Sequence, residues 1–173
     1  QIAAVTTHLG LGVTLSTSFT PPYHLARTLA SLDHLSGGRA AWNVIQSAGP
    51  ANYANFPTAE WLDGPELYDR GDEVVEAVVA LWQSWAADAL VADRDTGVFA
   101  DPSRITTPDY KGRYTAVRGP LNLPPTPQGQ PVIIQAGDSA RGREFGARWG
   151  EVIFAIERTA DDLRAKKTDL QTR

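Results

Sequence analysis

The segment IIQAGDSARGREFG combines residue types from which an anion site can be built. Gly137 ends a run of β-branched residues, and Ser139 stands where a helix carrying Arg141 and Arg143 is expected to begin. The N–H groups and positive dipole of a helix start attract phosphate or carboxylate. A serine at that position can cap the helix or bond the anion. The sequence therefore predicts an anion site, to which Asp138 contributes its backbone N–H because its carboxylate would repel the ligand.

No common nucleotide motif accompanies this segment. The GxGxxG pattern is absent, and so is the Gly-Lys-Ser/Thr of a P-loop, so a mononucleotide phosphate fits better than ATP. The chain has no cysteine, which excludes disulfides and thiolate metal sites. Its three histidines lack any familiar metal-ligand spacing, and we expect no metal site.

Polar side chains follow three of the four predicted strands. The strand ends are Thr14–Ser18, Asn43–Ser47, Gln135–Ser139 and Ala155–Glu157. Ligands of α/β proteins collect at the carboxyl ends of parallel strands. Serine, threonine and asparagine also serve turns and helix caps. Both interpretations, ligand contact and turn chemistry, stay open for these residues.

Alternating strands and helices must position these side chains. Strands are predicted over 9–17, 39–47, 131–137 and 151–156, and helices over 21–38, over 68–85, from Ser139 and from Thr159. This alternation predicts a parallel sheet with right-handed crossovers, with Val13, Leu15, Val44, Ile133 and Ile153 in or around it. A doubly wound sheet and a TIM barrel both fit, and periodicity does not choose between them.

Two stretches lie outside this pattern. Residues 49–67 read as a polar and aromatic loop, a candidate for part of a lid, and Tyr68 is expected to start the helix after it. Residues 86–130 read as an irregular insertion without a long helix. We treat 1–173 as one partial domain that contains this insertion.

Composition narrows the class of protein. The 173 residues are 42% hydrophobic and 21% charged, with a net charge of −4, which argues against a nucleic-acid-binding surface. No apolar run approaches the roughly 20 residues that span a bilayer, and no secretory signal is visible. These features favour a cytoplasmic protein. Because the first residue is Gln1, we interpret the chain as an internal segment of a longer protein.

Four long motifs resemble one known family. They are TSFTPPYHLARTLASLDHLSGGRAAWNV, YDRGDEVVEAVVALWQSW, GVFADPSR and VRGPLNLPPTPQGQPVIIQAG. Together they resemble the bacterial-luciferase-like flavin monooxygenases, in the branch of nitrilotriacetate, EDTA and dibenzothiophene-sulfone monooxygenases. The segments DALVADRDTGVFADP and PPYHLAR look most like the dibenzothiophene-sulfone enzymes.

The resemblance implies a TIM barrel of eight strands, of which this chain covers roughly the central half, from after the second strand to after the sixth. It also implies a two-component enzyme that uses O2 and reduced FMN from a separate NAD(P)H:flavin reductase to oxidise a small organic substrate, with organosulfur compounds such as dibenzothiophene sulfone as candidates. A homo-oligomer is expected, without nucleic-acid or membrane partners. Carried over by position, the flavin contacts are Thr14, Asn43, Tyr68 and the Asp138–Ser139 turn, with the FMN phosphate at Ser139. No catalytic residue is assigned.

One departure from the family is plain. The family pattern His-x-x-Arg-Tyr is replaced here by Gly64, Pro65, Glu66, Leu67 and Tyr68, without the histidine and arginine. Two other functions therefore stay open: a related barrel that uses the deazaflavin F420 for hydride transfer, and a flavin-binding protein without activity.

Overall fold

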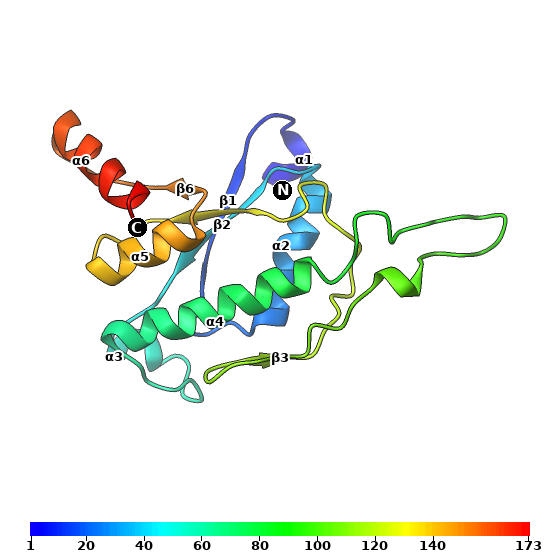
Figure 1. Ribbon diagram of the computed structural model, residues 1–173, viewed down its shortest axis with the longest axis horizontal. Helices are drawn as coiled ribbons and strands as arrows, with labels where there is room; N and C mark the ends of the chain where they lie inside the picture. The colour runs from blue at the N-terminus through cyan, green and yellow to red at the C-terminus, as the bar shows by residue number, and fades with distance from the viewer.

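The computed structural model describes residues 1–173, which build one four-stranded parallel sheet with helices packed against it (Figure 1). The strands are β1 (Leu11–Ser16), β2 (Ala40–Ile45), β5 (Val132–Gln135) and β6 (Val152–Ile153), in the order β1-β2-β5-β6. Every neighbouring pair is parallel, which confirms the predicted arrangement. The helices are α1 (Ile2–Val5), α2 (Pro22–Ser36), α3 (Pro50–Tyr53), α4 (Gly64–Trp82), α5 (Ala140–Trp149) and α6 (Ala160–Gln171).

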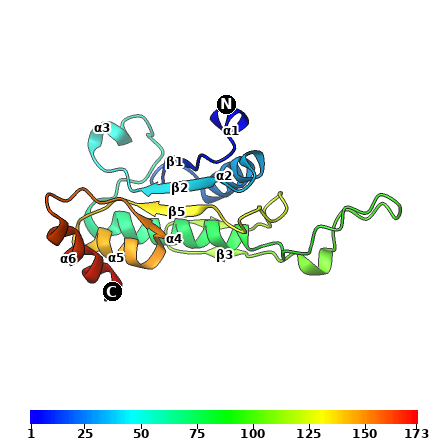
Figure 2. The same ribbon diagram turned by 90° about the horizontal axis from the view of Figure 1, so that it is seen from above.

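The two faces of the sheet have different surroundings. On one face Trp42, Val44 and Ile133 are buried in a core shared with α2 and α4, and Val13 and Leu15 pack against it half-buried. In Figure 2, α4 and α5 lie along one side of β5. On the other face Thr14 is exposed. Parallel sheets are normally covered on both faces, so this open face is the one that a complete barrel encloses.

The helix boundaries follow from proline and capping residues. Two prolines open α2, and Gly37, in the left-handed conformation with φ 66°, closes it. Helix α4 begins at Gly64 rather than at Tyr68 as predicted, because Pro65 fits the first turn of a helix. The same helix ends at Trp82, three residues before the predicted end at position 85.

The start of α5 agrees with the prediction. Ser139 is the N-cap, and its Oγ accepts a hydrogen bond from the Gly142 N–H at 3.0 Å. Thr159 caps α6 in the same way, accepting from the Asp162 N–H at 3.1 Å. Strand β6 covers only two of the six residues predicted for it, and Ile153 is half-buried.

Residues 86–130 contain no long helix, as expected, but they are not wholly irregular. They include a 3-10 turn (Pro102–Arg104) and an antiparallel hairpin of β3 (Tyr110–Lys111) and β4 (Ala116–Val117). The first part projects from the body as an arm (the green segment at the right of Figure 1). A bridge between Leu90 and Ala100 joins its two sides.

The stretch between β2 and α4 is a folded loop rather than an extended one. It contains α3, and its aromatic rings gather around Phe19 of the β1–α2 loop. Phe19 stacks on Phe56 with ring centroids 4.2 Å apart and meets Tyr53 edge-on at 5.1 Å.

No helix of the fold combines the length and the apolar character needed to cross a membrane.

Candidate functional site

The carboxyl-terminal part of β1 meets that of β2 through two predicted site residues. Thr14 and Asn43 are partners in the parallel register, and Asn43 Nδ2 donates to Thr14 Oγ1 at 3.0 Å. Asn43 Oδ1 is buried and accepts no hydrogen bond. Buried polar atoms are normally paired, so this amide oxygen is an acceptor that the fold leaves without a donor.

The turn between β5 and α5 offers donors to an anion. Ser139 is exposed, and since its Oγ accepts from Gly142, its hydroxyl proton is free to be donated. The N–H groups of Ala140 and Arg141 lie in the first turn of α5, where no intrahelical acceptor exists. This turn therefore offers the donors on which the predicted anion site depends.

Tyr68 of α4 reaches the same turn. A β-carbon on Gly137 would lie 2.9 Å from the Tyr68 hydroxyl, and one on Gly142 would lie 2.8 Å from it. The phenol thus lies directly against both glycines, and its ring packs on Phe145 with centroids 5.8 Å apart. The structure brings Tyr68 and the Asp138–Ser139 turn together from segments about 70 residues apart in the sequence.

Arg141 and Arg143 of α5 do not face an anion, contrary to the expectation from sequence. Arg141 pairs with Asp69 at 3.0 Å and with Asp72 of α4. Arg143 Nε lies 2.9 Å from Asp169 Oδ2, although its N–H is not aligned with that oxygen. Carboxylates already neutralise both guanidiniums, so the attraction for an anion comes from the helix start and Ser139.

The Asp138 carboxylate is held by cationic side chains outside the turn. It lies 2.8 Å from Lys166 Nζ and 3.7 Å from Arg143. The hydrogen bond from Lys166 lowers the pKa of Asp138 below its usual value. Lys166 also pairs with Glu157 at 2.7 Å, and these two carboxylates raise its own pKa. Sequence reasoning missed Lys166, because nothing in its exposed helical surroundings marks it.

Gln135, which the sequence marks only as the end of a strand, packs beneath the turn between β5 and α5. Its side chain is 2% exposed, and its amide lies against the positions where Gly137 and Gly146 would carry β-carbons. Side chains at both glycines would collide with it. The two glycines let α5 approach the end of β5 closely.

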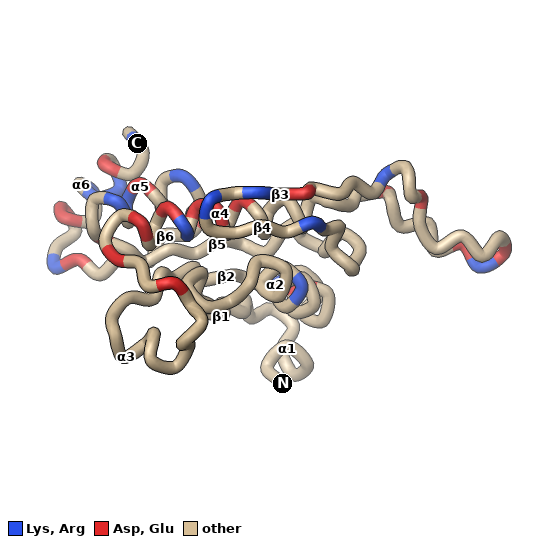
Figure 3. The backbone as a smooth tube through the Cα atoms, turned by 90° about the horizontal axis from the view of Figure 1, so that it is seen from below, with Lys and Arg blue, Asp and Glu red and all other residues tan.

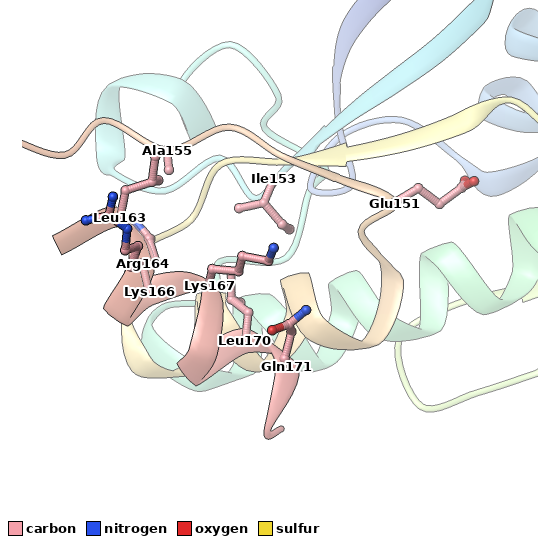
Figure 4. A pocket seen from close by; sticks show the side chains of 9 residues that line it. All are labelled: Glu151, Ile153, Ala155, Leu163, Arg164, Lys166, Lys167, Leu170 and Gln171. Carbon is pink, nitrogen blue, oxygen red and sulfur yellow. The ribbon is translucent and has the colours of Figure 1, made fainter. Parts of the chain in front are cut away.

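A separate cavity of about 580 Å³ lies between β6 and α6 and contains none of the five predicted site residues. Its walls are Ile153, Ala155, Leu163 and Leu170 with the stems of lysines and an arginine; Figure 4 shows α6 and the β6 segment on either side of it. Since β6 pairs only with β5, this cavity borders the open edge of the sheet.

Comparison with known proteins gives the family. The model of the luciferase-like monooxygenases matches residues 1–171. The chain belongs to this family. It is 50% identical to a dibenzothiophene-sulfone monooxygenase of Rhodococcus erythropolis over 95% of this chain and 36% of that protein. It is 40% identical to nitrilotriacetate monooxygenase component A of Aminobacter aminovorans over 99% of this chain and 38% of that protein.

Solved luciferase-like structures agree with the fold. A riboflavin lyase crystallised with modified FMN and riboflavin superposes with a TM-score of 0.93 at 39% identity, over 99% of this chain and 38% of the other. A coenzyme F420-dependent reductase from Methanopyrus kandleri superposes at 0.64 with 14% identity, over 98% of this chain and 46% of the other, which shows the fold alone. The chain is thus a segment of a luciferase-like TIM barrel, and it spans 36–38% of the two curated relatives.

Proposed function

We propose that the full-length protein to which this chain belongs is a two-component monooxygenase. It would use O2 and reduced FMN to oxidise a small organic substrate. Family membership and relatives named as monooxygenases support this proposal. The identity with the dibenzothiophene-sulfone enzyme favours an organosulfur substrate. The term component A in the name of one relative supports a separate flavin reductase as partner. A cytoplasmic homo-oligomer, and a single barrel domain with 86–130 as its insertion, complete the proposal.

The observation that carries the proposal is the meeting of Tyr68 with the start of α5. Ser139 and the first N–H groups of α5 would hold the FMN phosphate, while the bare backbone of Gly137 and Gly142 admits the Tyr68 hydroxyl beside them. Because the local carboxylates are paired with Lys166 or arginines, they leave the turn electrostatically suited to an anion.

Thr14 and Asn43 would contact the flavin ring. Both lie on the sheet face that a complete barrel encloses, and the unpaired Asn43 Oδ1 needs a donor from a ligand. When bound, FMN supplies the electrons for oxygen chemistry. The residues of this chain bind it, orient it and, on the barrel interior, keep water from it.

Gly64, the first residue of α4, occupies the position where the family pattern has a histidine. Gly64 has φ +50°, the left-handed region, and no atom lies within 4 Å of a β-carbon placed there. Any side chain at this position would have space but would strain the backbone by about 1–2 kcal/mol. Contacts from this side to FMN are therefore assigned to Tyr68 alone.

Two alternatives have less support. The coenzyme F420-dependent reductase that superposes on this chain is only 14% identical to it, whereas the riboflavin lyase that was solved with modified FMN is 39% identical. A flavin-binding protein without activity is favoured only by the absence of the histidine and arginine from positions 64 and 67.

The test uses the full-length protein with a flavin reductase, NADH, 18O2 and dibenzothiophene sulfone. We expect FMN to bind in preference to F420 and one 18O atom to enter the product. Ser139→Asp should weaken FMN binding about tenfold or more, because an added negative charge would face the phosphate. Thr159→Asp is the matched control, since aspartate remains a good N-cap in both helices. Unchanged FMN affinity in Ser139→Asp would place the phosphate elsewhere.

A further inference from the structure

A second cavity, of about 280 Å³, lies on the side of the sheet that carries the helices. Four segments enclose it: the β1–α2 loop, the stretch after α3, the middle of α4 and the tip of the β3–β4 hairpin. Its polar walls include Thr17, Ser18, Thr20, Thr58, Arg70 and Thr115. None of the proposed flavin contacts borders it, so the inference below does not rest on the proposed function.

Arg70 is the unusual residue of this cavity. It is only 7% exposed, yet no carboxylate lies within 4.0 Å of its guanidinium. Nη1 donates to the Glu60 carbonyl at 3.1 Å and Nη2 to the Tyr53 hydroxyl at 2.9 Å, while the buried Nε has no partner. Buried charges in proteins are normally paired. Arg141, on the next helix, shows the ordinary case with two carboxylates.

The loop above the cavity supplies no counter-charge. Residues 40–59 contain no Asp, Glu, Lys or Arg, and Figure 3 shows the loop around α3 free of charged residues. Glu60 is the single acidic residue of the lining, and it is exposed. Its carboxylate lies more than 4.0 Å from the Arg70 guanidinium. Glu73 of α4 reaches the same wall, but its carboxylate accepts from the N–H groups of Tyr114 at 2.7 Å and Thr115 at 3.2 Å. Arg70 therefore has no carboxylate as a direct partner.

Further donors face the same space. Helix α2 begins at Pro22 on the cavity wall, but neither Pro21 nor Pro22 carries an N–H, so this helix start contributes its dipole and no hydrogen-bond donor. The N–H groups of Phe19 and Thr20 donate to no acceptor of the chain. Phe19 and Phe56, stacked at 4.2 Å, form an aromatic wall beside these donors.

We propose that this cavity binds the oxyanion of a small organic acid, a carboxylate or sulfonate. Arg70 and the N–H groups of Phe19 and Thr20 would receive the anionic group, and the Phe19–Phe56 wall would cover its apolar part. The ligand would supply the direct anionic partner that the buried guanidinium lacks.

The test is calorimetric titration of the full-length protein, without flavin, with benzoate, benzenesulfonate, neutral benzamide and inorganic sulfate. We expect benzoate and benzenesulfonate to bind and to raise the melting temperature further as their concentration increases above Kd. Benzamide should bind at least tenfold more weakly. Equal binding of benzamide and benzoate, or binding of sulfate alone, would overturn the proposal.

Variants assign the binding to Arg70. Arg70→Gln should weaken benzoate at least tenfold, whereas Arg104→Gln, at an exposed arginine paired with Asp88, should leave it unchanged. Tyr53→Phe removes one partner of the guanidinium but not its charge, and should retain benzoate binding. If Arg70→Gln does not fold, Thr20→Glu decides, because a carboxylate on the wall should exclude benzoate. Unchanged benzoate binding in folded Arg70→Gln, or in Thr20→Glu, overturns the assignment.

Discussion

At the scale of single residues, Tyr68 owes its position to two glycines. Its hydroxyl occupies the space that β-carbons on Gly137 and Gly142 would need, so the phenol and the α5 turn can touch. The glycine at 142 is required for this close approach, since it lies inside a helix where its conformation is ordinary. An alanine there would push either Tyr68 or the Ser139 hydroxyl, 3.0 Å away, out of place.

Replacing Tyr68 by phenylalanine tests its role directly. The ring would keep its packing on Phe145, but the hydroxyl donor beside the turn would be lost. We expect FMN affinity of the full-length protein to fall by about 1 kcal/mol, or about fivefold, in a fluorescence titration. Tyr110→Phe is the control, since its hydroxyl bonds Glu76 on α4 at 2.7 Å, away from the turn. Wild-type affinity in Tyr68→Phe would remove this residue from the flavin site.

At the scale of secondary-structure elements, a buried aspartate joins α2 to β2 and to the turn before β5. Asp33 is 0% exposed and accepts three hydrogen bonds: from the Ala40 N–H at 3.1 Å, and from Gln128 Nε2 at 2.6 Å and its N–H at 3.2 Å. The carboxylate thereby fixes where α2 ends relative to the sheet.

Asp33→Asn should destabilise the protein through this junction. The new amide NH2 would face at least one of the donors that the carboxylate accepts, so a hydrogen bond to a charged group is lost. We expect a decrease of about 2–3 kcal/mol in the free energy of unfolding, seen in urea as a lower midpoint with the same slope. Asp88→Asn, in an exposed pair with Arg104, should cost less than about 1 kcal/mol. Equal losses in the two variants would contradict the role of Asp33.

The contact between α5 and α6 should depend on pH through Asp138. Its pKa is lowered in the fold, mainly by the hydrogen bond from Lys166, so its stabilising contribution is present above the unfolded-state pKa. That contribution is lost as the pH falls through the folded-state pKa. The raised pKa of Lys166 has the opposite consequence: its contribution holds at neutral pH and is lost only in strong alkali.

We therefore expect the melting temperature to fall between about pH 5 and pH 3 more steeply in the wild type than in Asp138→Asn. The comparison of the two curves isolates this pair from the other carboxylates. Parallel curves would show that the ion pair with Lys166 does not stabilise the fold.

At the scale of the whole molecule, the sequence was sufficient for the order of elements and for the parallel sheet. Alternation of β-branched runs with helical spacing is a local signal, and Ser139 and Thr159 mark helix starts by their chemistry. The partners of Arg141 could not be predicted, because Asp69 and Asp72 belong to another helix and meet it only through packing. Arg70 was missed for the same reason: nothing local distinguishes a buried helical arginine from an exposed one.

Helix α4 restricts where the chain can gain or lose residues. Successive residues are turned by about 100° around a helix, so Tyr68 faces the α5 turn and Arg70 faces the second cavity, while Val78 and Leu81, further along, enter the core. A single deleted codon within α4 would rotate one of these sets away from its partners. The arm between Leu90 and Ala100 has no such constraint, since it projects from the body and is largely exposed (Figure 1). Length variation between relatives can therefore accumulate in the arm, whereas α4 must keep its register.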